Sequence, residues 1–364
     1  MSHYHLVQRP DGRAQRYCGG IDAESLFLYE PGGYHPVELG DVMNNGRYKI
    51  LHKLGWGSVA TTWAAKDQKR HLYVAIKIMV SKVEGSRELN MLRALSALPK
   101  DHPGSSYVCQ MLDHFTHVGP NGTHTCLVLE LVGPNVAEFV DCYGIDKSQQ
   151  TSCHTCETIC ETDVNLAIVV PGLDSLSEED FIATLGDFVT GAVTKIDHGP
   201  WAPNVPTEMI RPAIFREEDV LAAPCPSIKI IDFGDAFFSD DAPSTLNNPF
   251  VLRAPEIVFK DRLDLRVDLW TAGCLIFELV CGIPPIDAGS TLTLVRQMIA
   301  TTSEELPSRW QAQWYDMQQG KVEDDGGLNR LTLKEWLRRQ EKVFPKNGFN
   351  EKHRATRLSK YEVG

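Results

Sequence analysis

The stretch that decides the fold is "LGWGSVATTWAAKDQKRHLYVAIK", residues 54–77. Apolar and polar residues alternate across residues 47–80, which predicts three β-strands with turns at "GWG" and "KDQKR". Gly55 and Gly57 form a Gly-x-Gly-x-x-Ala string, where the missing Cβ lets backbone amides approach a phosphate. Taken alone, such glycines are more often a plain hairpin turn. A dinucleotide-binding fold would need a helix directly after the loop, and "TTWAAKD" reads as a strand instead.

Three further residues favour a nucleotide site. Lys77 ends "VAIK" and precedes a predicted helix, residues 84–98, that carries Glu88. A lysine on a third strand can reach phosphate oxygens when a helix carboxylate holds it in place. Asp232 follows the apolar strand "IKII" and precedes Phe-Gly, a setting that suits a ligand for Mg²⁺, which prefers hard oxygen atoms. Residues 267–280 form a strongly apolar predicted helix.

Composition limits the class of protein. The chain has 364 residues, of which 43% are hydrophobic and 23% charged, as in ordinary globular proteins. The net charge of -12 argues against direct binding of nucleic acid or of anionic membranes and allows a basic partner. The first fifteen residues have no apolar run typical of a secretory signal, and no run is long enough to span a bilayer. With ten scattered cysteines expected to be reduced, we expect a cytoplasmic or nuclear location.

The motifs occur in the order that is typical of protein kinases: Gly-x-Gly, VAIK, a helix glutamate, DFG, and APE at residues 254–256. The string Asp268-x-Trp270-x-x-Gly273 also resembles that family. The stretches "YEPGGYHPVELGD", "LVLELVGPNV", "GLDSLSEEDFIATLG" and "LWTAGCLIFELV" resemble the SR-protein kinase group, especially its fungal members. The resemblance covers residues 30–307.

The resemblance implies an α+β, bilobal protein-kinase-like fold with a small, mostly β N-lobe and a larger, mostly α C-lobe. The C-lobe is expected to be incomplete, because the final helices of the family are not recognisable after Pro307 and Glu256 would lack its buried partner. The implied regions are an irregular lead-in (1–44), the N-lobe and hinge (45–133), the C-lobe core (134–306) with an aberrant segment at 141–164, and a C-terminal region of uncertain structure (307–364).

The resemblance also implies ATP and Mg²⁺ as cofactors and a set of site residues. Lys77 would contact the α- and β-phosphates and pair with Glu88, and Asn165 and Asp232 would hold Mg²⁺. Val59 and Ala75 would pack on the adenine, and Glu130 and Val132 would bond it through their main chains. The full set of nucleotide-binding residues is Leu54, Gly55, Gly57, Val59, Ala75, Lys77, Glu130 and Val132.

One part of the family pattern is missing. Active kinases carry His-x-Asp, four further residues and then Asn, and no such string is present. Two registers are open. The first puts Asn165 at the metal-binding Asn and Cys160 where the catalytic base belongs. The second makes Asp163 the base and puts Ile168 at the Asn. We prefer the first, and either one predicts impaired phosphoryl transfer, because positioning and electrostatics carry this reaction.

Three interpretations of function follow. The first is a monomeric serine/threonine kinase that uses ATP to phosphorylate basic, Ser/Arg-rich proteins. The second is a pseudokinase that binds ATP or a partner protein as a scaffold. The third is an altered product of a gene for an active kinase, since the family pattern stops abruptly near residue 141 and resumes at Asn165. A zinc site at Cys153, His154, Cys156 and Cys160 lacks the paired spacing of zinc ribbons, so we expect reduced cysteines there.

Overall fold

The computed structural model describes eight ranges of the chain, and among them residues up to Phe237 form one compact unit and residues from Phe238 a second. Each unit is described by itself below. The first unit contains residues that the sequence analysis assigned to the C-terminal lobe, from Asn165 onward. The described ranges are 16–82, 87–99, 101–136, 165–196, 200–222, 227–281, 284–302 and 304–319.

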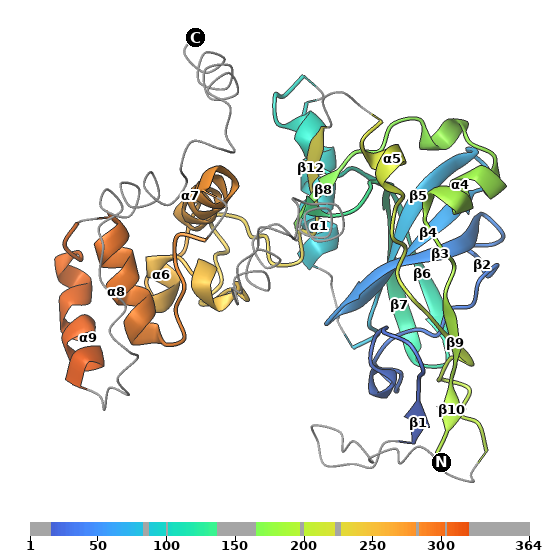
Figure 1. Cartoon of the computed structure of the whole chain (residues 1–364), viewed down its shortest axis with the longest axis horizontal. Coiled ribbons are helices and arrows are strands. Elements are labelled where there is room, and N and C mark those ends of the chain that lie inside the picture. The colour runs from blue at the N-terminus through green and yellow to red at the C-terminus, as the bar shows by residue number, and fades with distance from the viewer. Residues whose placement is uncertain are drawn as a thin grey trace, which may run out of the picture. The chain divides into compact units, whose positions relative to one another are not determined.

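The first unit is built on a six-stranded antiparallel sheet of order β2-β3-β4-β5-β7-β6 (Figure 1). The three strands predicted between residues 47 and 80 are confirmed. The expected turn at "GWG" is wrong, because Gly57 pairs with Ala60 and leaves only Ser58 and Val59 for the turn. The strands are β2 (Val42–Met43), β3 (Tyr48–Gly57), β4 (Ala60–Asp67), β5 (Leu72–Met79), β6 (Met111–Gly119) and β7 (Gly122–Glu130).

The two faces of this sheet carry different neighbours, as the two-residue period of a strand requires. On the front face, Ala60 and Met79 form a buried cluster with Leu92 of helix α1 (Arg87–Ser96). That helix lies within the predicted range 84–98, whose residues 84–86 fall outside the described part. The back face buries Trp63 of β4 together with Ile76 and Ile78 of β5. Val37 of the lead-in and Ile210 cover this cluster.

Short elements surround the sheet. The insertion between β8 and β12 packs on it, since Phe181 of α4 stacks on Tyr73 of β5 with ring centroids 3.7 Å apart. Ser177 caps α4 by accepting from the amide of Asp180. The short strands pair as β1 (Tyr17–Cys18) with β10 (Thr194–Lys195), β9 (Thr190–Ala192) with β11 (Glu208–Ile210), and β8 (Leu166–Ile168) with β12 (Ile228–Ile230). The short helices are η1 (Leu26–Leu28), η2 (Ser105–Tyr107), η4 (Leu173–Ser175), α4 (Glu178–Thr184) and α5 (Glu217–Val220).

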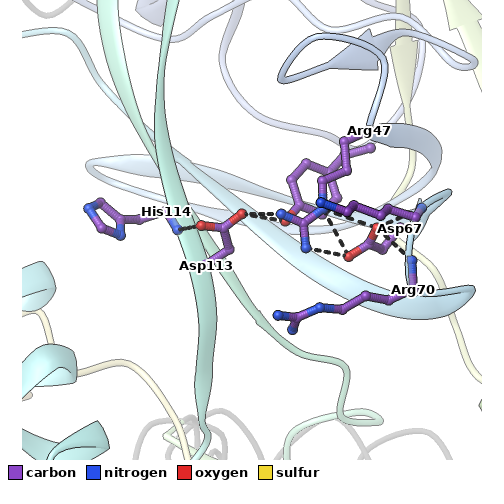
Figure 2. A network of polar contacts seen from close by, with 7 residues as sticks. Arg47, Asp67, Arg70, Asp113 and His114 are labelled. Carbon is purple, nitrogen blue, oxygen red and sulfur yellow. Dashed lines mark hydrogen bonds and ion pairs between the residues drawn. The ribbon is translucent and has the colours of Figure 1, made fainter.

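A charged network ties three strands of the sheet together (Figure 2). The Arg47 guanidinium is 2.8 Å from an oxygen of Asp67 and 2.7 Å from an oxygen of Asp113. The Tyr48 hydroxyl also donates to Asp113, over 2.7 Å. Asp67 further accepts from the amides of the following turn, and its side chain is only 3% exposed. The network therefore joins the start of β3, the end of β4 with the turn that follows it, and β6.

The second unit is helical in its described part. Its elements are η5 (Phe250–Leu252), α6 (Pro255–Val258), α7 (Arg266–Cys281), α8 (Thr291–Thr302) and α9 (Ser308–Gln319), of which α7 matches the predicted apolar helix. Phe259 stacks on Trp310 of α9 at 4.8 Å, and Asp261 accepts from Arg309 and from the Trp310 indole. Glu256 is buried, and its Oε1 has no hydrogen-bond partner among the described residues. None of the described helices combines the length and apolar character needed to cross a membrane.

Candidate functional site

The glycine-rich hairpin β3–β4 presents an open tip. Trp56, Gly57 and the turn are exposed, while Leu54 is half-buried at the point where β3 bulges. Val59 lies in the turn and is 40% exposed, and Ala75 lies in β5; the packing of both residues on an adenine stays a prediction. The residue that faces Lys77 across the ladder is Thr62 of β4. Because the β4–β5 pairing sets Thr62 opposite Lys77, a register count from Lys77 would have added Thr62 to the candidate site residues.

Lys77, Glu88 and Asp232 converge on one point from three elements. The Lys77 ammonium of β5 lies 2.8 Å from Oε1 of Glu88 in α1 and 2.9 Å from Oδ1 of Asp232, which follows β12. The side chains of Lys77 and Glu88 are 12% and 3% exposed, whereas that of Asp232 is 50% exposed. The lysine is thus held from the buried side by one carboxylate and meets a second, accessible one.

The charges of this cluster are set by opposing effects. Burial disfavours the ammonium of Lys77, but the charges of Glu88 and Asp232 outweigh it and raise the pKa of Lys77. Burial also acts against the carboxylate of Asp232, yet Lys77 and the Gly234 amide hold its pKa below the ordinary value. For Glu88, burial prevails over Lys77 and raises the pKa. Lys77 and Asp232 therefore stay ionised at neutral pH.

Strand pairing brings Asn165 next to Asp232. β8 and β12 are antiparallel, with Leu166 opposite Ile230, and the Ile231 amide donates to the Asn165 carbonyl at 2.8 Å. Asp232 itself has φ +57, a left-handed conformation that Asp tolerates better than most residues. Its Oδ1 accepts from the Gly234 amide at 3.2 Å. Strained backbone of this kind clusters at functional sites.

The second register for the catalytic loop meets a packing problem. It would make Ile168 a metal ligand, but Ile168 lies inside β8 opposite Ile228 and is buried in an apolar cluster with Phe181. The first register uses Asn165, which is exposed at the end of the same strand. Asp163, Cys160 and the cysteine and histidine residues considered for zinc lie outside the described residues.

The expected hinge follows the last paired residue of β7. Glu130 pairs with Val74, its amide donates to Gln110, and its carboxylate forms an ion pair with Lys229 of β12. Val132 comes two residues later, in a segment without regular secondary structure. Ala75 lies between Ala64 and Leu129 in the ladder. The predicted adenine contacts other than Val59 therefore come from neighbouring strands and the segment after β7.

The donor atoms of the cluster suit a divalent cation bound to phosphate. Asp232 offers an accessible carboxylate, and Asn165 stands beside it on the paired strand. Mg²⁺ typically takes one or two protein oxygens and completes its shell with water and phosphate. In the described part of the chain, no group of three or more His, Cys, Asp or Glu side chains could hold a metal ion. A Mg²⁺ site that is completed by water and phosphate does not require three such ligands.

Comparison with known proteins shows similarity to protein kinases. The protein kinase domain family matches residues 215–337, a range that extends past Pro307, where the sequence analysis saw no kinase pattern. A serine/threonine protein kinase of Aspergillus fumigatus is 29% identical over 264 residues, covering 71% of this chain and 64% of that relative. The chain is therefore similar to protein kinases, and the predicted kinase-like fold, with its β-rich N-terminal part and helical C-terminal part, is confirmed.

Other similar proteins are SRPK-type kinases. The serine/threonine-protein kinase SRPK of Physarum polycephalum is 29% identical over 295 residues, covering 70% of this chain and 65% of the relative. The human SRSF protein kinase 3 is 36% identical over 116 residues, 31% of this chain and 20% of that protein. The chain is thus related to SRPK-type serine/threonine kinases, and it spans slightly less than two thirds of the length of the relatives that it matches most extensively.

Proposed function

We propose that the protein is an ATP- and Mg²⁺-dependent serine/threonine kinase of the SR-protein type. The observation that carries the proposal is the convergence of Lys77, Glu88 and Asp232 within hydrogen-bond distance. Glu88 fixes the Lys77 ammonium where it can bind α- and β-phosphate oxygens. Asp232 and Asn165 would hold Mg²⁺, which neutralises developing charge on the transferred phosphoryl group. The glycine-rich hairpin would cover the phosphates.

The ion pair between Lys77 and Asp232 suggests how the site changes on binding. Without nucleotide, the lysine is paired with both carboxylates. With phosphates and the cation bound, Lys77 would donate to phosphate oxygens and Asp232 would be free to hold the cation, while Glu88 would keep Lys77 as its partner. Because Asp232 is half-exposed and Glu88 is buried, only Asp232 is free to exchange partners.

For the substrate, we infer basic, Ser/Arg-rich segments of proteins. The support is the chain's net charge of -12 and its relationship to kinases named for such substrates. We place the protein in the cytoplasm or nucleus, where such substrates occur, and treat it as a monomer. A pseudokinase remains the second candidate, favoured by the missing His-x-Asp string in the sequence.

Mg-ATP binding and phosphate transfer, measured on the same samples, distinguish the kinase from the pseudokinase. Wild type and Lys77→Met are titrated with Mg-ATP by thermal shift, and phosphate transfer to an Arg-Ser repeat peptide is followed with labelled ATP. A kinase gives a shift and transfer, both lost in Lys77→Met. A pseudokinase gives a shift that depends on Lys77 without transfer. No shift in the wild type would refute nucleotide binding. Lys49→Met, in the same sheet but outside the cluster, is the matched control.

A further inference from the structure

The lead-in contains a tight turn, "YEPGGY", at residues 29–34. The Tyr34 amide donates to the Leu28 carbonyl at 2.9 Å, and the Gly33 amide donates to the Glu30 carbonyl at 2.7 Å. A Cβ on Gly33 would lie 1.9 Å from the Leu28 oxygen, so only glycine permits this closure. Gly32 has φ +87, a conformation that favours glycine. The backbone that carries Tyr34 is therefore locally determined.

Backbone hydrogen bonds fix this turn to the sheet. In the segment after β5, the amides of Ser81 and Lys82 donate to the carbonyls of Gly33 and Gly32. From the β6–β7 turn, the Asn121 side chain donates to the Tyr34 carbonyl at 2.6 Å. The turn is thus held from the segment after β5 and from the β6–β7 turn at once, which fixes the direction in which the Tyr34 side chain leaves the backbone.

That direction leads to the glycine-rich hairpin. The Tyr34 side chain is almost completely buried, and its hydroxyl donates to the carbonyl of Gly57, the last residue of β3. Beyond the turn, the Val59 carbonyl accepts from the Val80 amide at 2.8 Å. The exposed tip of the hairpin is therefore tied to fixed parts of the unit at both ends of its turn.

A second contact joins the lead-in to the same strand four residues earlier. The Lys53 ammonium forms an ion pair with Glu24, and both side chains are 1% exposed. The hydroxyl of Tyr29 also donates to Glu24. Lys53 lies over the rings of Trp56 and Trp63, at 5.6 and 5.4 Å. The lead-in thus holds β3 at its middle as well as at its end.

We propose that Tyr34 is a positioning residue for the nucleotide: it holds the glycine-rich hairpin in its covering position before the nucleotide binds. The inference rests on the function proposed above. A loop that is already ordered costs less conformational entropy on binding, so the hydroxyl of Tyr34 strengthens binding without touching the ligand. Its loss should weaken nucleotide binding and leave the chemical step largely unchanged.

The test compares Tyr34→Phe with Tyr48→Phe in the full-length chain. Both changes remove one hydroxyl from a buried tyrosine, but that of Tyr48 donates to Asp113 at the opposite end of β3. Amide hydrogen exchange of residues 55–62 is measured without nucleotide, and Mg-ATP affinity is measured by calorimetry. Where the wild type transfers phosphate, kcat and the KM for ATP are measured as well.

For Tyr34→Phe we expect faster exchange in residues 55–62 and about three- to tenfold weaker Mg-ATP binding, the equivalent of one hydrogen bond. We expect a raised KM with kcat changed less than about twofold, because uniform binding energy is lost. Tyr48→Phe should change neither. Unchanged exchange in Tyr34→Phe, or equal effects of the two variants, would overturn the inference. A wild type that does not bind Mg-ATP refutes the proposed function, while the exchange measurement still decides whether Tyr34 holds the hairpin.

Discussion

The buried ion pair between Lys53 and Glu24 allows a sharp test of how the lead-in is held. Its two side chains are 1% exposed, so neither charge is solvated by water when the other is removed. Breaking such a pair from one side costs about 3–5 kcal/mol, whereas replacing both partners is often close to neutral. Domains have only about 5–15 kcal/mol of stability in total. Loss of one partner should therefore remove a large part of the stability of the first unit.

The perturbation is a double-mutant cycle with Lys53→Met, Glu24→Gln and the double variant. Methionine fills the volume of the lysine stem, and glutamine can still accept from the Tyr29 hydroxyl. We expect each single variant to lose about 3–5 kcal/mol and the double variant only about 1–2 kcal/mol, since no unpaired charge is left. The assay is native-state hydrogen exchange in β4 and β5, which reports the opening free energy of this unit.

The same strand offers a matched control. Lys49 forms an ion pair with Glu178 at 2.6 Å, but these side chains are 38% and 41% exposed. Lys49→Met should cost less than about 1 kcal/mol, as exposed pairs generally do. The reasoning is refuted if Lys53→Met costs no more than Lys49→Met, or if the losses of the two single variants simply add in the double variant.

Three further predictions concern other contacts. Burial raises the pKa of Asp67, but Arg47 and the turn amides lower it more. The carboxylate therefore contributes its full stabilisation above about pH 4, and this contribution is lost as the pH falls through the lower, folded-state pKa. Asp67→Asn should lower the Tm at pH 7 and make the Tm fall less steeply in acid, both measured by circular dichroism. Hydrogen bonds from Arg309 lower the pKa of Asp261 to about 2, so Asp261→Asn should speed hydrogen exchange in α9 at pH 7, and no change would contradict this. Gly33→Ala should cost about 2 kcal/mol or more in urea unfolding because its Cβ meets a carbonyl oxygen.

Those residues that lie in locally patterned segments could be predicted from sequence. Three alternating strands, an apolar helix and the strand before Asp232 determine where Lys77 and Asp232 sit along the chain, and their meeting follows once the motif order is recognised. The position of one turn was wrong: the glycine pattern suggested a turn at "GWG", while the pairing of Gly57 with Ala60 places the turn at Ser58–Val59. Turn position depends on register, which the local sequence does not specify alone.

Contacts between distant segments could not be predicted in the same way. The ion pair of Lys53 with Glu24 joins residues 29 positions apart, and the hydrogen bond from Tyr34 to Gly57 joins residues 23 positions apart. No periodic pattern marks such pairs, because each depends on how an irregular segment lies on a sheet. A buried lysine also contradicts the usual expectation that lysine faces solvent, and only its partner explains it.

The described groups proposed to bind the nucleotide all belong to the first unit, and this separates binding from transfer. Lys77, Glu88, Asp232 and Asn165 are positioned by β5, α1 and the pair β8–β12, all within that unit. The missing His-x-Asp part of the catalytic string would precede Asn165 in the sequence, outside the described residues. A chain that keeps the first set and lacks the second can still bind Mg-ATP with its lead-in and hairpin in place. Affinity for nucleotide therefore tests the geometry of the cluster, and only phosphate transfer tests the catalytic loop.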